Sequence, residues 1–189
     1  GETFNDDASF QSFNPYNIAD KNDWRRWNVD QTIVLIRNAI KSKKEYIAFG
    51  VSPFGVWRNK ADDPIGSDTR AGITNYDHLF ADILYWLKEG WIDYVAPQIY
   101  WDTEHKTANY KVLVDWWSLH SQGKPIFIGH SLYRLNSDPA PWDSPKQMMD
   151  QIKIARNKPN TYGSIFFSAN HLNRDLKGFQ DSISTKLYK

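Results

Sequence analysis

The stretch YVAPQIYWD, residues 94–102, decides the fold of this chain. It begins as an apolar run of the kind that forms a buried strand. It ends in polar and aromatic residues, among them Gln98, Tyr100, Trp101 and Asp102. These four residues are either the irregular end of a core strand or side chains that a strand delivers into a site.

The same arrangement recurs along the chain. Other short apolar runs occupy residues 46–53, 125–133 and 163–169, and we interpret them as buried strands. Helix-period patterns lie over residues 23–44, 76–87, 110–117, 144–155 and 176–187. Apolar strands that alternate with amphipathic helices predict a parallel sheet with right-handed crossovers.

The loops favour a barrel over a nucleotide-binding sheet. No strand is followed by a GxGxxG or GxxxxGK[ST] motif. Long loops follow the strands and short loops precede them, which is typical of (β/α) barrels, whose sites lie at the carboxyl ends of the strands. A full barrel has eight units in about 250 residues, whereas this sequence has four. We therefore predict an α/β fold, a partial (β/α) TIM-like barrel of about four parallel strand–helix units preceded by a helix.

One domain accounts for the whole chain of 189 residues. Residues 1–22 are predicted to be an irregular segment of that domain, and residues 23–189 the C-terminal half of a barrel. The chain opens on Gly-Glu-Thr without methionine, so we expect a segment of a longer protein, with any export signal upstream.

Composition excludes several classes of function. The net charge is +1 and the basic residues are scattered, so no nucleic-acid partner is expected. No apolar run approaches the roughly 18 residues of a membrane span. The chain has no cysteine, and its histidines lack a metal-ligand spacing, so we expect neither a metal nor another cofactor. Aromatic residues make up 15% of the chain, and most of them are expected to fill the core.

Every predicted strand ends in polar or aromatic residues. In parallel strands these ends meet at one edge of the sheet. Amide, imidazole, guanidinium and aromatic groups suit the hydroxyls and C–H faces of a sugar. The residues at the strand ends include Ser52, Phe54, Trp57, Arg58, Gln98, Tyr100, Trp101, Asp102, His130, Tyr133, Arg134, Asn170 and His171. The alternatives remain that these residues are ordinary loop entries and that His130 is a core histidine.

A catalytic pair is incomplete in this sequence. Glycoside hydrolysis uses two carboxyl groups on either side of the scissile bond. Asp102 is the candidate catalytic residue, and Glu104 lies in the same loop, which is a poor position from which to flank a bond. Ser131 and Ser168 lack a GxSxG setting, which argues against a serine nucleophile.

Several segments resemble one known family. They are SPFGVWRNK at 52–60, GWIDYVAPQIYW at 90–101 and IFIGHSLYRL at 126–135. The chain resembles the C-terminal half of the TIM-like barrel of the bacterial glycosyl-hydrolase-like family 10. FNDDASFQSF at 4–13 and DWRRWNVDQTI at 23–33 look like the loop and helix after the family's fourth strand, whose acidic motif would lie upstream of Gly1.

The resemblance implies a glycan substrate, such as peptidoglycan or another polysaccharide, and a periplasmic, cell-surface or secreted location. It also implies that a set of residues lines a glycan cleft, namely Ser52, Trp57, Arg58, Gln98, Tyr100, Trp101, His130 and Tyr133. Arg134 and Asn170 complete the substrate-binding set that we predict from the strand ends.

The function predicted from the sequence is therefore a fragment of a glycoside hydrolase, inactive by itself because its acids are incomplete. The alternatives are a non-catalytic carbohydrate-binding domain and a purely structural unit. Half a barrel leaves unpaired sheet edges, so we also expect either a homodimer or residues 1–22 folded across the open face.

Overall fold

The computed structural model describes residues 4–136 and 139–187. Its first half contains α1 (Asp7–Ser12), α2 (Lys21–Lys43), β1 (Gly50–Val51), α3 (Asn75–His78), α4 (Ile83–Lys88) and β2 (Tyr94–Val95). Its second half contains α5 (Tyr110–His120), β3 (Ile126–His130), the 3-10 helix η1 (Leu132–Leu135), α6 (Lys146–Arg156), β4 (Thr161–Phe166), α7 (Ala169–Asn173), the 3-10 helix η2 (Leu176–Gly178) and α8 (Phe179–Lys186).

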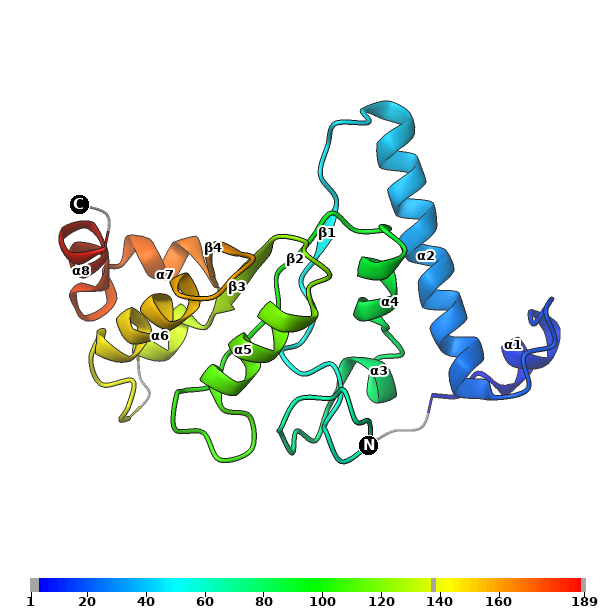
Figure 1. The fold of residues 1–189 in the computed structure, drawn as a ribbon, viewed down its shortest axis with the longest axis horizontal. Coiled ribbons are helices and arrows are strands. Elements are labelled where there is room, and N and C mark those ends of the chain that lie inside the picture. Colours follow the sequence, from blue (N-terminus) through cyan, green and yellow to red (C-terminus); the bar gives the residue numbers. More distant parts are fainter. Residues whose placement is uncertain (1–3, 137–138, 188–189) are drawn as a thin grey trace.

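The four strands form one parallel sheet in chain order, β1-β2-β3-β4. Val51 pairs with Val95, and Val95 pairs with Ile126. Figure 1 shows the helices following one another along this sheet, with α2 at one end, beyond α4, and α8 beyond β4 at the other. The predicted fold class, a partial TIM-like barrel of strand–helix units, is confirmed.

The boundaries differ from the sequence pattern at several places, and two of them lie in the first half of the chain. The pattern over residues 76–87 predicts one helix, but the structure has α3 and α4, because Phe80 adopts a left-handed φ of 53°. The amide of Ala81 then donates back to the carbonyl of Asn75, which closes the first helix. Residues 4–22, expected to be irregular, contain the short helix α1, and residues 1–3 of that segment lie outside the described residues.

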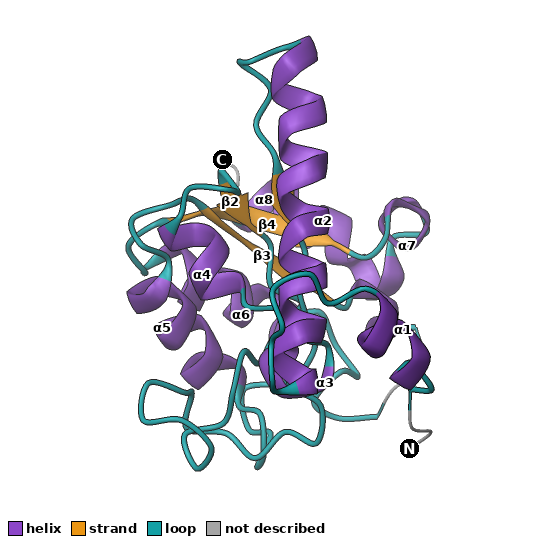
Figure 2. Ribbon diagram, turned by 90° about the vertical axis from the view of Figure 1, so that its right-hand side faces the viewer, coloured by secondary structure: helices purple, strands orange, loops and turns teal. Residues whose placement is uncertain are grey.

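The two faces of the sheet have different neighbours. Side chains on a strand point alternately to opposite faces. Val95, Ile126 and Ile128 point toward α4, α5 and α6 and are fully buried. The opposite face, which we call the inner face, carries Tyr94, Phe127, Ile165 and Phe167, and Figure 2 shows how the helices gather around the strands.

The inner face is partly open. Tyr94 and Phe127 meet edge to face with 5.5 Å between ring centroids, whereas Ile165 is 46% exposed. Contiguous exposed apolar surface is a feature of many association sites. Self-association through this face or through the edges at β1 and β4 stays a prediction, because it concerns a second chain.

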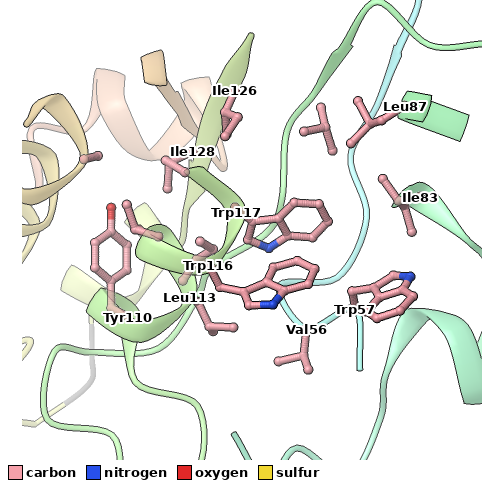
Figure 3. Close-up of a cluster of buried hydrophobic side chains, with 14 of the residues drawn as sticks. Val56, Trp57, Ile83, Leu87, Tyr110, Leu113, Trp116, Trp117, Ile126 and Ile128 are labelled. Carbon is pink, nitrogen blue, oxygen red and sulfur yellow. The ribbon is translucent and has the colours of Figure 1, made fainter. Parts of the chain in front are cut away.

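The core lies between the sheet and the helices. Figure 3 shows Trp117 of α5 on the side of Ile126 and Ile128 of β3, and Trp116 on the side of Val56 and Trp57. Trp116 and Trp117 meet edge to face at 5.0 Å. Most aromatic residues were expected to fill the core, and both of these tryptophans are buried there. Their burial against the sheet fixes α5 and so positions the loops at both of its ends.

Candidate functional site

The carboxyl ends of the strands are held in register beyond the strands themselves. The amide of Gln98 donates to the carbonyl of Pro53 at 2.9 Å, and the amide of Ile99 donates to Gly129 at 3.1 Å. The amide of Phe167 donates to His130 at 2.9 Å. These bonds join the segments that follow all four strands into one edge, which we call the rim.

Aromatic side chains gather at the rim around Tyr133 of η1. Its ring centroid lies 6.2 Å from that of Tyr100, 6.4 Å from that of Phe167 and 6.2 Å from that of His171. The four residues follow three different strands, β2, β3 and β4. We call Tyr100, Tyr133, Phe167 and His171 the rim aromatic cluster.

The rim aromatic cluster is accessible to a ligand. Tyr133 is 39% exposed and Phe167 is 58% exposed. Phe54, which follows β1 and bridges to Gln98, is 42% exposed. Large aromatic rings that remain exposed are typical of recognition sites, and each tyrosine also presents a hydroxyl group that can form hydrogen bonds. Tyr100 is more enclosed, and its burial, together with the neighbouring Tyr133, raises the pKa of its phenol.

His171 has a defined tautomer in its neutral form. Its Nδ1 accepts a hydrogen bond from the amide of Ser168 at 3.3 Å, in the capping box that begins α7. The proton of the neutral ring therefore lies on Nε2, which can donate to a ligand. Asn170, also on α7, is exposed beside it. Together they add polar groups next to the aromatic rings.

Three of the predicted binding residues hold the backbone of the rim. The Oγ of Ser52 donates to the carbonyl of Ala96 at 2.8 Å, and the Nε2 of Gln98 donates to the carbonyl of Ser52 at 2.8 Å. The Nη1 of Arg134 donates to the carbonyl of Tyr100 at 2.9 Å. These donors join neighbouring strand ends, so the three residues position the rim.

Asp102 and Trp101 lie in the loop after β2. The Oδ1 of Asp102 accepts from the amide of Glu104 at 2.9 Å, and its carbonyl accepts from the amide of Tyr110 at 3.1 Å. Trp101 is partly buried against the core, and its ring is so close to Gly55 that a Cβ there would lie 2.8 Å from it. Asp102 thus shapes the turn into α5, and it remains our candidate for a charged role.

Trp57 and Arg58 do not join the rim aromatic cluster. Trp57 is 4% exposed, because its ring stacks on Trp116 and its Nε1 donates to Asp82. The guanidinium of Arg58 is bound by two oxygens of Asp77, at 3.0 and 2.7 Å. Each side chain is committed to packing or pairing within the chain, so neither offers a free face to a sugar.

His130 is a core residue. It shares the face of Ile126 and Ile128 and is 0% exposed. Its two ring nitrogens meet the Oγ of Ser164 at 3.0 Å and the Oε1 of Gln151 at 3.3 Å. Burial lowers its pKa to about 4, so the ring is neutral at pH 7. The structure therefore favours the core-histidine alternative over contact with a ligand.

The structure adds Phe167 to the candidate site, together with Phe54 and His171, which lie among the predicted strand-end residues but outside the predicted binding set. All three come directly after strands or at the first turn beyond them, so their positions could be derived from the sequence. Phe167 lies two residues after Ile165, on the same face by strand alternation. This alternation predicts that Phe167 and Phe166 point to opposite faces, and Phe166 packs in the core.

No metal site is visible in the described part of the chain. Among residues 4–136 and 139–187, no three histidine or acidic side chains lie close enough to hold a metal ion. Across the same residues, none of the helices combines the length and apolarity that a bilayer crossing requires.

The parallel sheet in chain order, with helices on one face and a polar and aromatic rim at the carboxyl ends of its strands, defines a protein of the (β/α)-barrel class. The chain belongs to the family described as glycosyl hydrolase-like 10, which matches residues 1–147.

Two relatives bear names that describe hydrolases. The glycosyl hydrolase YngK of Bacillus subtilis is 45% identical over 192 aligned residues, which cover all of this chain and 38% of that protein. The glycosyl hydrolase DigH of Escherichia coli K12 is 36% identical over 183 residues, which cover 92% of this chain and 41% of that protein. The chain thus spans about two fifths of the length of these relatives.

Proposed function

We propose that this chain forms the glycan-binding part of a glycoside hydrolase that acts on peptidoglycan glycan strands or another polysaccharide outside the cytoplasm. The observation that carries the proposal is the rim aromatic cluster at the carboxyl ends of the strands. Its exposed rings offer flat apolar surfaces to the C–H faces of sugar rings, and the nearby amide and imidazole groups can bind hydroxyls. Membership of a glycosyl hydrolase-like family supports this choice of ligand.

Replacing Tyr133 with alanine is expected to weaken binding of a glycan oligosaccharide about tenfold. Tyr133 contacts three members of the cluster, so its loss removes a stacking surface and also releases its neighbours. Isothermal titration calorimetry with peptidoglycan glycan fragments and neutral oligosaccharides measures the change.

The matched control is Tyr46→Ala. Tyr46 is 80% exposed and lies beyond the far end of α2, so this variant removes an exposed tyrosine without touching the rim. Equal affinities for the wild type and Tyr133→Ala would contradict the proposed site. An equal loss in both variants would indicate nonspecific contact with aromatic residues.

A second proposal, a non-catalytic carbohydrate-binding domain, is favoured by the turn geometry of Asp102, whose carboxylate accepts a backbone hydrogen bond. The two proposals differ in turnover. If Asp102 is catalytic, Asp102→Asn in a full-length protein that carries this segment abolishes hydrolysis of a reducing-end-labelled glycan and leaves binding intact.

The chain of 189 residues alone is expected to show little or no turnover, because Asp102 and Glu104 share one loop, which is a poor position from which to flank a bond. The same labelled glycan tests this expectation by chromatography of the products. Strong turnover by the isolated chain would contradict it, and retention of activity in Asp102→Asn would favour an auxiliary binding role for this segment.

A further inference from the structure

A hollow of about 490 Å³ lies between the loop that follows β1 and the loop that follows β2. Figure 1 shows both loops at the lower edge of the molecule, where the segments after the strands gather. The hollow is lined by Lys60, Ala61, Asp68, Thr69, Arg70 and Lys106. It is separate from the rim aromatic cluster, with which it shares no residue.

The first wall of the hollow is rigid. Asn59 is buried, and its Oδ1 accepts from the Oγ1 of Thr69 at 2.9 Å and from the amide of Ala71 at 2.8 Å. The amide of Lys60 donates to the carbonyl of Ser67 at 2.8 Å, which closes the loop on itself. A buried side chain that holds the backbone at several points preorganises the loop.

The second wall is fastened to the first. The amide of Arg70 donates to the carbonyl of Thr107 at 2.8 Å, and its Nη2 donates to the carbonyl of Lys106 at 3.2 Å. Gly66 allows the close approach within the first loop, since a Cβ there would lie 2.5 Å from the carbonyl oxygen of Asn59. The backbone that carries the charged side chains is therefore set before any ligand binds.

The hollow carries an excess of positive charge. Lys60, Arg70 and Lys106 contribute three positive charges, and Asp68 contributes one negative charge. Within the described residues, none of the three cations has a carboxylate within 4.0 Å. Elsewhere in the structure, cations such as Arg25 and Lys158 are paired with acids. The residues that line the hollow thus carry a net charge of +2, whereas the net charge of the whole chain is +1.

We propose that this hollow binds an anionic substituent, a carboxylate or a phosphate, of the glycan that the rim holds. Two lysine ammonium groups and a guanidinium can surround the oxygens of such a group with charge-assisted hydrogen bonds. The identity of the polymer rests on the proposed function, but the hollow itself requires only an anion. A polymer that reaches both the rim aromatic cluster and the hollow would be selected for its charge as well as for its sugar rings.

Affinity electrophoresis in gels that contain dextran, carboxymethyl-dextran or dextran phosphate tests the hollow. The three probes share a backbone and differ in charge. The wild type is expected to be retarded by the two charged polymers more than by dextran. Lys60→Gln/Lys106→Gln should weaken the retardation about tenfold, which corresponds to two exposed ion pairs. The charged polymer whose retardation of the protein falls more in the double variant identifies the anion as carboxylate or phosphate.

Lys43→Gln/Lys44→Gln is the matched control. It removes the same two charges at the exposed C-terminal end of α2, far from the two loops, and should change retardation less than twofold. Asp68→Asn should act in the opposite direction and strengthen binding two- to threefold, because it removes the negative charge that faces the anion. Circular dichroism checks that each variant is folded.

Equal losses in the two double variants would overturn the proposal, since attraction would then depend on total charge. Unchanged retardation in Lys60→Gln/Lys106→Gln would also overturn it. Failure of the glycan proposal has a different signature, because Tyr133→Ala would then leave neutral oligosaccharide binding unchanged while the hollow still responded to the charged polymers.

Discussion

Replacing Trp117 with alanine is expected to lower the free energy of unfolding by about 3 to 5 kcal/mol. Trp117 is fully buried at the centre of the core, between α5 and the sheet (Figure 3). Its Nε1 donates to the carbonyl of Gly55 at 2.8 Å, and its ring packs edge to face on Trp116. The substitution therefore creates a large cavity and leaves a buried carbonyl without its partner.

Urea denaturation followed by circular dichroism measures this loss. Leu119→Ala in the same helix is the control, since Leu119 is 78% exposed and its truncation should cost less than about 0.5 kcal/mol. If Trp117→Ala does not fold, Trp117→Phe keeps part of the packing and should give an intermediate loss. A loss near that of the control in both Trp117 variants would show that the core is placed elsewhere.

Replacing Asp30 with asparagine is expected to stabilise the fold at pH 7 by about 1 to 3 kcal/mol, the lower part of this range reflecting the partial exposure of Asp30. Burial of Asp30 against α4, reinforced by the Asp82 carboxylate, raises its pKa from 3.8 to about 6. Between pH 3.8 and about pH 6, Asp30 is therefore protonated in the folded chain and ionised in the unfolded chain. Acidification from pH 7 toward 4.5 therefore stabilises the wild type through this group.

His130 acts in the opposite direction over the same window. Its pKa is lowered from 6.5 to about 4 by complete burial, so the unfolded chain gains a proton there before the folded chain does. Acidification from pH 6.5 to 4.5 thus removes stability through His130. In the wild type, acidification therefore adds stability through Asp30 and removes stability through His130. In Asp30→Asn only the loss through His130 remains.

Urea unfolding at pH 7, 5.5 and 4.5 tests the pair. Asp30→Asn should be more stable than the wild type at pH 7 and should lose stability more steeply as the pH falls. The indole N–H of Trp86 can donate to the amide oxygen of asparagine as it does to Asp30, so the contact survives. Asp181→Asn on the exposed face of α8 is the control. Parallel stability curves for the wild type and Asp30→Asn would contradict the prediction.

The fold could be predicted because its signals are periodic. The apolar runs at 46–53 and 125–133 contain β1 and β3, and the helix-period pattern over 23–44 corresponds to α2 within two residues. The break between α3 and α4 could not be predicted in this way. Phe80 is neither glycine nor proline, so nothing in the local sequence indicates its left-handed φ of 53°.

The candidate site was only partly accessible from the sequence. Tyr100 and Tyr133 reach the rim because they follow strands, as expected. His130 also ends a strand, but it continues the alternation of Ile126 and Ile128 and so points into the core. Arg58 binds Asp77, nineteen residues along the chain, and no local pattern indicates that partner. Pairings of this kind depend on how the loops fold.

The close contact between the backbone segments that follow β1 and β2 is an advantage for engineering new specificity into this fold. Gly55 lies so close to Gln98 that a Cβ would come within 2.7 Å of its carbonyl oxygen, so the backbone there tolerates no added bulk. Phe54, immediately before it, keeps 42% of its side chain in solvent. Side chains at positions 54, 133 and 167 can therefore be exchanged in a combinatorial library while the backbone that presents them stays in place.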